Sequence, residues 1–299
     1  MNNQPLVSII IPTYKRPDTL DRAIKSVLNQ TYQNIEVIVV DDNNPDTEGR
    51  TLTIEKMKEF EDNPQVHYIQ HEHNKNGSAA RNTGARSSKG EYVAFLDDDD
   101  EYTPKRIESL LKRFSELPAE YGVCYSRYIS RMPNGKDVIS KENREGDLFL
   151  VALMKELTFG SGSNNLVKRD AYEAIGGYDE TFKRNQDHEF MIRLLQRYKI
   201  AYCDELGLII HVHMEKRNIS IEEILQHYVE SFKPIVDTLP IDVQHTFYKK
   251  VNVNYFIHYF RTEHDFKKAF SLISQGKINI IDAALALWRG GIRMLKRAI

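Results

Sequence analysis

Cysteine, tryptophan and long hydrophobic runs are scarce in this chain. Its 299 residues include two cysteines, Cys124 and Cys203, and one tryptophan. Two distant cysteines form neither a CxxC pair nor a zinc-ligand pattern, which excludes a disulfide scaffold and a zinc ribbon. No run approaches the ~18 apolar residues of a membrane-spanning helix, and the polar N-terminus lacks a signal peptide. We therefore expect a protein that is made and kept in the cytoplasm.

An excess of charge of one sign is also missing. The chain has 41 Lys and Arg residues against 43 Asp and Glu residues, giving a formal net charge of −2. No global basic field attracts nucleic acid, so a nucleic-acid partner is not expected and any anion binding must be local. The hydrophobic fraction of 41% excludes a disordered chain and is ordinary for a globular protein.

Short β-branched apolar segments alternate with amphipathic segments in the first hundred residues. Strands are predicted at 6–11, 35–40, 66–70 and 91–96. The intervening segments have helical patterns, for which Leu20, Ile24 and Val27 provide an apolar stripe at i, i+4 and i+7. This alternation predicts an α/β fold with a Rossmann-like, mostly parallel sheet flanked by helices. From residue 221 onward only helical patterns occur, which predicts an all-helical C-terminal extension over 221–299.

Polar residues gather where the predicted strands end. Thr13–Arg16 follows the first strand, Asp41-Asp42 ends the second, and Asp97–Asp100 follows the last. In parallel α/β sheets, ligands bind outside the carboxyl ends of the strands. Four adjacent carboxylates repel one another, and Mn²⁺ or Mg²⁺ would relieve that repulsion. The alternatives are a solvated acidic turn for the long run and a turn-starting pair for the short one.

Three further features have both a functional and a structural interpretation. Arg81 lies on a predicted small-residue helix, where it either pairs with an acid or a phosphate or is simply solvated. His211 and His213 would share one face of a strand, as metal ligands or as half-exposed strand histidines. The segment 160–165 is rich in glycine and serine and is expected to be a flexible turn.

Six short blocks, in order, resemble the family 2 glycosyltransferases with the GT-A fold. The blocks are Ser8–Arg16, Asp41-Asp42, Asn76–Gly84, Phe95–Asp100, Gly176–Glu180 and Gln186–Phe190. The resemblance covers roughly residues 5–220. It implies an inverting enzyme that moves a sugar from a nucleotide donor to an acceptor hydroxyl.

The resemblance also implies a nucleotide site. Thr13, Tyr14 and Arg16 would line the base pocket, with the Tyr14 ring against the base. Asp42 would accept the N–H of a uracil, and Arg81 would lie beside the nucleotide. The expected donor is therefore a UDP-sugar.

The acidic run has its own implied division of roles. Asp98 would contact the ribose and Asp99 would bind the metal, with Asp97 and Asp100 supporting them. The resemblance thus implies a metal-dependent transferase that uses Mn²⁺ or Mg²⁺.

The implied acceptor base is Asp187, and its alternative role is a helix N-cap, because it is expected to open the helix that follows. Many family members have a glutamate before this aspartate, whereas this chain has Gln186. A late histidine reaches the metal or the diphosphate in similar enzymes, and we favour His213 over His211.

We expect a catalytic GT-A domain over 1–220, with a nucleotide-binding half over 1–100 and an acceptor half over 101–220. The acceptor would be a glycan or a lipid-linked glycan in surface polysaccharide or glycoprotein synthesis. One alternative is a nucleotidyltransferase, although the glycine-rich phosphate loop of that class is missing after the first strand. The other is a sugar-nucleotide or glycan-binding module without catalysis.

The last predicted helix, 281–299, is basic and amphipathic. It has no acid after Asp282 and carries Leu285, Trp288, Ile292 and Leu295 together with Arg289, Arg293, Lys296 and Arg297. Such a helix can lie on an anionic membrane surface, which would make the protein a peripheral membrane protein. The alternative is packing against the catalytic domain or against a second subunit in a homodimer.

Overall fold

The computed structural model describes residues 4–213 and 220–288. The chain divides into two compact units, Met1–Met214 and Glu215–Ile299. Each unit has its own core and is described by itself.

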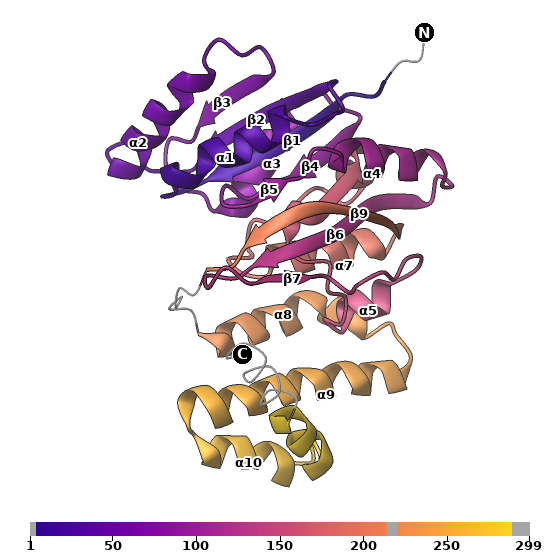
Figure 1. Cartoon of the computed structure of the whole chain (residues 1–299). Coiled ribbons are helices and arrows are strands. Elements are labelled where there is room, and N and C mark those ends of the chain that lie inside the picture. Colours follow the sequence, from indigo (N-terminus) through magenta and orange to yellow (C-terminus); the bar gives the residue numbers. More distant parts are fainter. Residues whose placement is uncertain (1–3, 214–219, 289–299) are drawn as a thin grey trace. The chain divides into compact units, whose positions relative to one another are not determined.

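One mixed sheet runs through the described part of the N-terminal unit (Figure 1). Its strands are β1 (Val7–Thr13), β2 (Ile35–Asp41), β3 (Val66–Gln70), β4 (Tyr92–Phe95), β5 (Glu101–Tyr102), β6 (Tyr121–Arg131), β7 (Asp137–Ile139), β8 (Asn165–Lys168) and β9 (Lys199–His211). The strand order is β3-β2-β1-β4-β8-β6-β9-β5, and β7 pairs with β6. Strands β1 to β4 are parallel, whereas β8 is antiparallel to both β4 and β6. The predicted fold class, α/β with a mostly parallel sheet, is confirmed.

Helices cover both faces of the parallel half of the sheet. The helices of this unit are α1 (Pro17–Leu28), α2 (Glu48–Met57), α3 (Gly77–Ser87), α4 (Arg106–Ser115), α5 (Phe149–Leu153), α6 (Arg169–Ala174) and α7 (Gln186–Leu195). Alternate residues of β1 face opposite sides. Ile9 and Ile11 share a core cluster with Leu20 of α1. On the other face, a Cβ at Gly84 of α3 would lie only 2.4 Å from the Cγ2 atom of Ile10. Glycine at this position lets α3 pack close to the sheet.

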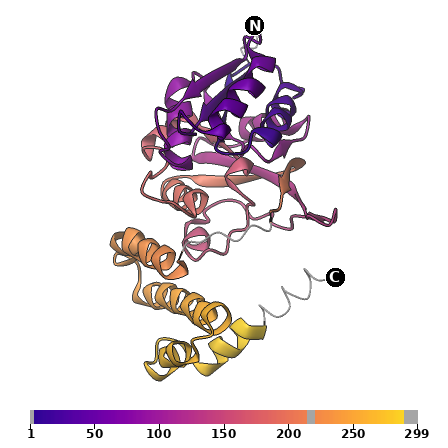
Figure 2. The same cartoon turned by 90° about the vertical axis from the view of Figure 1, so that its left-hand side faces the viewer.

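The C-terminal unit is helical in its described part, as predicted. Its helices are α8 (Ile221–Val236), α9 (Ile241–His258), α10 (Phe266–Ser274) and a last helix over residues 280–288. Figures 1 and 2 show α9 between α8 and α10. Phe256, Ala269 and Leu272 form part of its core. Among the described helices, none is both long and apolar enough to cross a bilayer. The basic residues Arg289, Arg293, Lys296 and Arg297 lie outside the described residues.

Glu142 anchors the loop between β7 and α5. Its carboxylate is buried and accepts hydrogen bonds from the Arg144 side chain, with Nε 2.7 Å from Oε1, and from the Thr158 backbone N–H, 3.1 Å from Oε2. Burial alone would raise the pKa of Glu142, but these donors outweigh it and lower the pKa to about 2. The ionised carboxylate therefore stabilises the folded chain.

We predict that Glu142→Gln lowers the free energy of unfolding by about 2 kcal/mol at pH 7. The amide is uncharged, and its NH₂ group would face the Arg144 or Thr158 donors instead of accepting from them. Stabilisation by Glu142 is complete above its ordinary pKa of 4.5 and is lost as the pH falls through about 2. The difference between wild type and variant should therefore shrink below pH 4.5. Urea unfolding at several pH values measures it. Glu120→Gln, which alters an exposed pair with Lys199, is the control; a pH-independent difference for Glu142→Gln would contradict the prediction.

Candidate active site

Three carboxylates crowd together just beyond the carboxyl end of β4. Asp97, Asp99 and Asp100 each offer an oxygen, and these oxygens lie within 4.8 Å of one another. Burial first, and then the neighbouring negative charges, raise the pKa values of Asp99 and Asp100. A set of carboxylate oxygens suits Mg²⁺ or Mn²⁺, and a cation there would offset the repulsion. The residues present therefore fit a divalent metal.

Asp98 turns away from this cluster, toward the end of β1. Its Oδ2 atom accepts a hydrogen bond from Thr13 Oγ1 at 2.8 Å and from the Tyr14 backbone N–H at 3.4 Å. Arg16 Nη1 lies 3.4 Å from Asp98 Oδ1 and also pairs with Asp99. Burial and the Asp99 charge raise the pKa of Asp98 to about 7, against the opposing effects of Arg16 and Thr13. The structure thus brings the predicted residues of the β1 end against the acidic run.

The turn after β1 is held by Asn43. Lys15 has a left-handed backbone, with φ of 59°, and its N–H donates to Asn43 Oδ1 at 3.0 Å. Glycine at position 49 leaves room for this contact, because a Cβ there would lie 2.6 Å from Asn43 Oδ1. Tyr14 is left 41% exposed, with the Lys15 ammonium 5.0 Å from the centroid of its ring, so a planar group could stack on the ring if Lys15 moves aside.

Asp100 is tied to residues that arrive much later in the chain. Ser163 Oγ donates to Asp100 Oδ2 at 2.7 Å and accepts from the Asp97 N–H at 3.0 Å. The His211 N–H donates to Asp100 Oδ1 at 3.2 Å. Ser163 lies in the 3-10 turn Gly162–Asn164, which is buried, so the expectation of a flexible turn there was wrong. Sequence reasoning missed Ser163, because its glycine-rich and serine-rich neighbourhood is typical of a loop.

The two histidines have separate partners. Strand β9 ends at His211, so the prediction that both rings share one strand face is wrong. His211 Nε2 lies 2.6 Å from Glu101 Oε1, whereas His213 Nε2 lies 3.1 Å from Asp99 Oδ2. His213 is therefore the histidine beside the acidic cluster.

The Asp42 carboxylate is buried at the end of β2 and is fully engaged by protein donors. They are His71 Nδ1 at 2.7 Å, Asn74 Nδ2 at 2.8 Å, Lys75 N at 2.8 Å and Asn76 N at 2.9 Å. The other ring nitrogen of His71 lies 2.9 Å from Thr83 Oγ1 on α3. Asp42 thus fixes the loop that leads into α3, and its contact with a uracil stays a prediction. His71 was missed by sequence reasoning; its place directly after β3 was the available signal.

Arg81 connects the acidic cluster to the start of α7. Its guanidinium pairs with Asp97 and donates from Nη1 to Gln186 Oε1 at 3.0 Å. The group also lies over the Tyr178 ring, 5.4 Å from its centroid. Arg81 is therefore paired with an acid, not a solvated surface arginine.

Asp187 is the second residue of α7, not its first. The helix begins at Gln186, its N-cap position is Asn185, and Asp187 Oδ1 accepts a hydrogen bond from the adjacent His188 N–H at 2.9 Å. The N-cap alternative for Asp187 is therefore wrong. Lys155 lies close enough for the Asp187 charge to act on it: burial lowers the pKa of Lys155 to about 8, and Asp187 opposes that shift.

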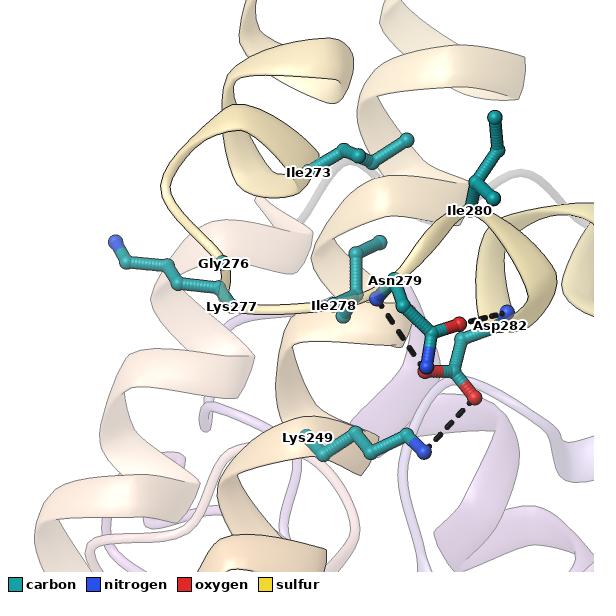
Figure 3. Close-up of a pocket in the computed structure, with 8 residues that line it drawn as sticks. All are labelled: Lys249, Ile273, Gly276, Lys277, Ile278, Asn279, Ile280 and Asp282. Carbon is teal, nitrogen blue, oxygen red and sulfur yellow. Dashed lines mark hydrogen bonds and ion pairs between the residues drawn. The ribbon is translucent and has the colours of Figure 1, made fainter.

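A separate hollow of about 480 Å³ lies in the C-terminal unit (Figure 3). Lys249 Nζ lies 2.9 Å from Asp282 Oδ1, and the Asp282 N–H donates to Asn279 Oδ1 at 2.8 Å. These contacts cap the helix over residues 280–288. Lys249, Asn279 and Asp282 are thus engaged with one another, and the hollow offers no comparable cluster of carboxylates.

Comparison with known proteins agrees with this geometry. The model of glycosyl transferase family 2 matches residues 8–176. The putative colanic acid biosynthesis glycosyl transferase WcaA of Escherichia coli is 38% identical over 233 residues, covering 74% of this chain and 77% of the relative. An uncharacterized glycosyltransferase of Haemophilus influenzae is 27% identical over 76% of this chain and 78% of its own length. The crystal structure of S. aureus TarS 1-349 in complex with UDP-GlcNAc has a TM-score of 0.65 at 18% identity, covering 89% of this chain and 75% of that chain. That last likeness concerns the fold alone.

Proposed function

Because the chain belongs to the family 2 glycosyltransferases, we propose that it transfers a sugar from a UDP-sugar to an acceptor hydroxyl with inversion at the anomeric carbon. The observation that carries this proposal is the acidic cluster after β4, which lies against the end of β1. The UDP-GlcNAc complex of TarS supports a nucleotide-sugar donor. Family membership supports glycosyl transfer over the nucleotidyltransferase alternative.

The nucleotide would bind across the ends of β1 and β2. The exposed Tyr14 ring would stack on the uracil, with Thr13 and Arg16 lining the pocket. Asp42 would contribute to nucleotide binding through the loop that it fixes. Asp98, beside the carboxyl end of β1, would contact the ribose. Arg81 would lie at the diphosphate end, beside Asp97.

Asp99 and His213 would hold a Mn²⁺ or Mg²⁺ ion, supported by Asp97 and Asp100. When bound, the ion would supply positive charge to the leaving diphosphate. Arg16 already pairs with Asp99 and would move toward the phosphates when a cation takes its place.

Asp187 would accept the proton of the acceptor hydroxyl as that oxygen attacks the anomeric carbon. Its carboxylate is not the N-cap of α7, and it stands in the first turn of that helix. Asp187 is linked to the acidic cluster through Gln186 and Arg81, so the base and the donor site share one framework.

The acceptor class follows from the relatives. The printed name of WcaA places that protein in colanic acid biosynthesis, which supports an acceptor in surface polysaccharide synthesis for this chain. A lipid-linked glycan or a glycoprotein acceptor is the alternative. Action on the cytoplasmic side stays a prediction.

We also propose peripheral membrane contact through the last helix. Ile280, Ile281 and Trp288 are 71%, 66% and 64% exposed there. Arg289, Arg293 and other basic residues follow in the sequence. Exposed aliphatic and indole groups next to cationic residues favour an anionic lipid surface.

The metal prediction uses the geometry of the acidic run. Asp99→Asn should reduce Mn²⁺-dependent UDP affinity strongly, because it removes a metal ligand. Changing a residue that only orients a ligand costs about 10–100-fold, and the loss here should be larger. Asp170→Asn is the control, because this exposed carboxylate in the first turn of α6 accepts its neighbour's N–H and lies outside the proposed site, so UDP and Mn²⁺ affinity should stay unchanged. Calorimetry with UDP, with and without EDTA, measures both. Metal-independent UDP binding in the wild type would overturn the cation site.

The base prediction has a matched control within the chain. Asp170, the second residue of α6, accepts its neighbour's N–H at 2.7 Å just as Asp187 does. Asp187→Asn should keep its melting temperature and UDP binding and lose at least about 100-fold in transfer rate. Asp170→Asn should keep full activity. A panel of labelled UDP-sugars offered to glycolipid and polysaccharide acceptors provides the assay, and an active Asp187→Asn enzyme would exclude Asp187 as the base.

The membrane prediction is tested with vesicles. Wild-type protein should co-sediment with vesicles containing anionic phosphatidylglycerol and not with phosphatidylcholine vesicles. The double variant Ile281→Ser, Trp288→Ser should lose most of that binding, because both side chains are exposed in the fold. The homodimer alternative would be favoured if the wild type binds neither kind of vesicle and light scattering shows a dimer for the wild type but a monomer for the double variant.

A further inference from the structure

Arg106, the first residue of α4, is fully buried without a carboxylate partner among the described residues. Its Nη1 atom donates to Asn164 Oδ1 at 2.9 Å and to Ser126 Oγ, and Nη2 donates to the Ser163 carbonyl at 3.2 Å. The guanidinium lies over the Tyr102 ring, 4.5 Å from its centroid. The charge is thus solvated by neutral groups only.

Burying an unpaired guanidinium is costly, and apolar side chains usually fill such a space at lower cost. The surrounding core nevertheless accommodates it. A Cβ at Gly207 would lie 3.1 Å from Arg106 Nη1 and 2.6 Å from Ser126 Oγ, so glycine is needed there. A buried arginine that is this costly indicates a role beyond filling the core.

What Arg106 holds is the turn Gly162–Asn164. Asn164 is also fixed by its own donor, with Nδ2 2.7 Å from the Ser126 and Phe159 carbonyls. These bonds hold the turn on both sides, and it presents the Ser163 hydroxyl to the acidic run. That one hydroxyl donates to Asp100 at 2.7 Å and accepts from the Asp97 N–H at 3.0 Å.

We propose that Ser163, held in place by Arg106, is a positioning residue that presets Asp97 and Asp100 for a divalent cation. The inference rests on the cation site of the proposed function. Carboxylates that repel one another rotate apart unless something fixes them, and a cation then has to reassemble them at a cost in affinity. Ser163 fixes the Asp100 carboxylate and the backbone of Asp97 at the same time.

The chain contains a matched control for this role. Ser8 is also fully buried, donates to Glu36 Oε1 at 2.7 Å and accepts from the Gly90 N–H at 2.8 Å. Its two bonds match those of Ser163 in number and type, but Ser8 lies near the start of β1, away from the carboxyl end of the sheet. A purely structural serine at 163 would behave as Ser8 does.

The experiment compares Ser163→Ala with Ser8→Ala in the full chain. Thermal unfolding reports the loss of stability, and electron paramagnetic resonance of free Mn²⁺, with saturating UDP, reports cation affinity. Both variants should melt at a lower temperature than the wild type. Only Ser163→Ala should weaken Mn²⁺ binding, by about 10–100-fold. Ser163→Cys, which keeps the size of the side chain and weakens the donor, should show a smaller loss of the same kind, and Arg106→Lys a comparable one.

The outcomes are distinguishable. If the wild type binds Mn²⁺ and Ser163→Ala and Ser163→Cys bind it as Ser8→Ala does, the positioning role is overturned and the cation site stands. If the wild type binds no Mn²⁺ with UDP, the cation site fails and this inference fails with it. A Mn²⁺ loss confined to the Ser163 and Arg106 variants supports the inference.

Discussion

Repulsion among the four consecutive carboxylates Asp97–Asp100 is the constraint on which the carboxyl edge of the sheet depends. Each of them has a different partner from elsewhere in the chain, and these partners are Arg81 for Asp97, Thr13 for Asp98, Arg16 and His213 for Asp99, and Ser163 for Asp100. No two consecutive aspartates have the same set of partners, so their four side chains point in different directions. The elements that surround the acidic run must converge on one point: β1 and β9 end there, β8 begins there, and α3 passes it at Arg81.

The mixed half of the sheet makes this convergence achievable. A purely parallel sheet would place only strand ends and helix starts around the acidic run. The antiparallel strand β8 instead begins beside the end of β4 and brings the buried turn Gly162–Asn164 with it. Strand β9 brings the His211 N–H to Asp100 and leads to His213. In the proposed function the N-terminal half would form the nucleotide side, and the later strands bring Ser163, His211 and His213 to the acidic run.

The sequence predicted the first four strands, their parallel arrangement and the acidic residues, because these depend on local periodicity and on the geometry of strand ends. It could not assign directions to consecutive aspartates beyond a strand, because the partners of their side chains lie far along the chain, as His213 does from Asp99 and His211 from Asp100. The same limit explains why Ser163 and His71 were missed and why the start of α7 was placed one residue late. The roles of Asp42, Asp98 and Asp187 remain predictions.

Gln186 shows how one substitution can matter to this charge balance. The resemblance implies that many members of the family carry a glutamate at this position, and a glutamate would give Arg81 a second carboxylate partner. Here the amide oxygen of Gln186 accepts a single bond from Arg81 at 3.0 Å. The arginine charge is then shared only with Asp97 among the described carboxylates that pair with it. A neutral partner leaves more of that charge directed at the acidic cluster, and it places no additional negative group beside Asp187. Gln186 therefore adds no electrostatic repulsion between Asp187 and the acidic cluster.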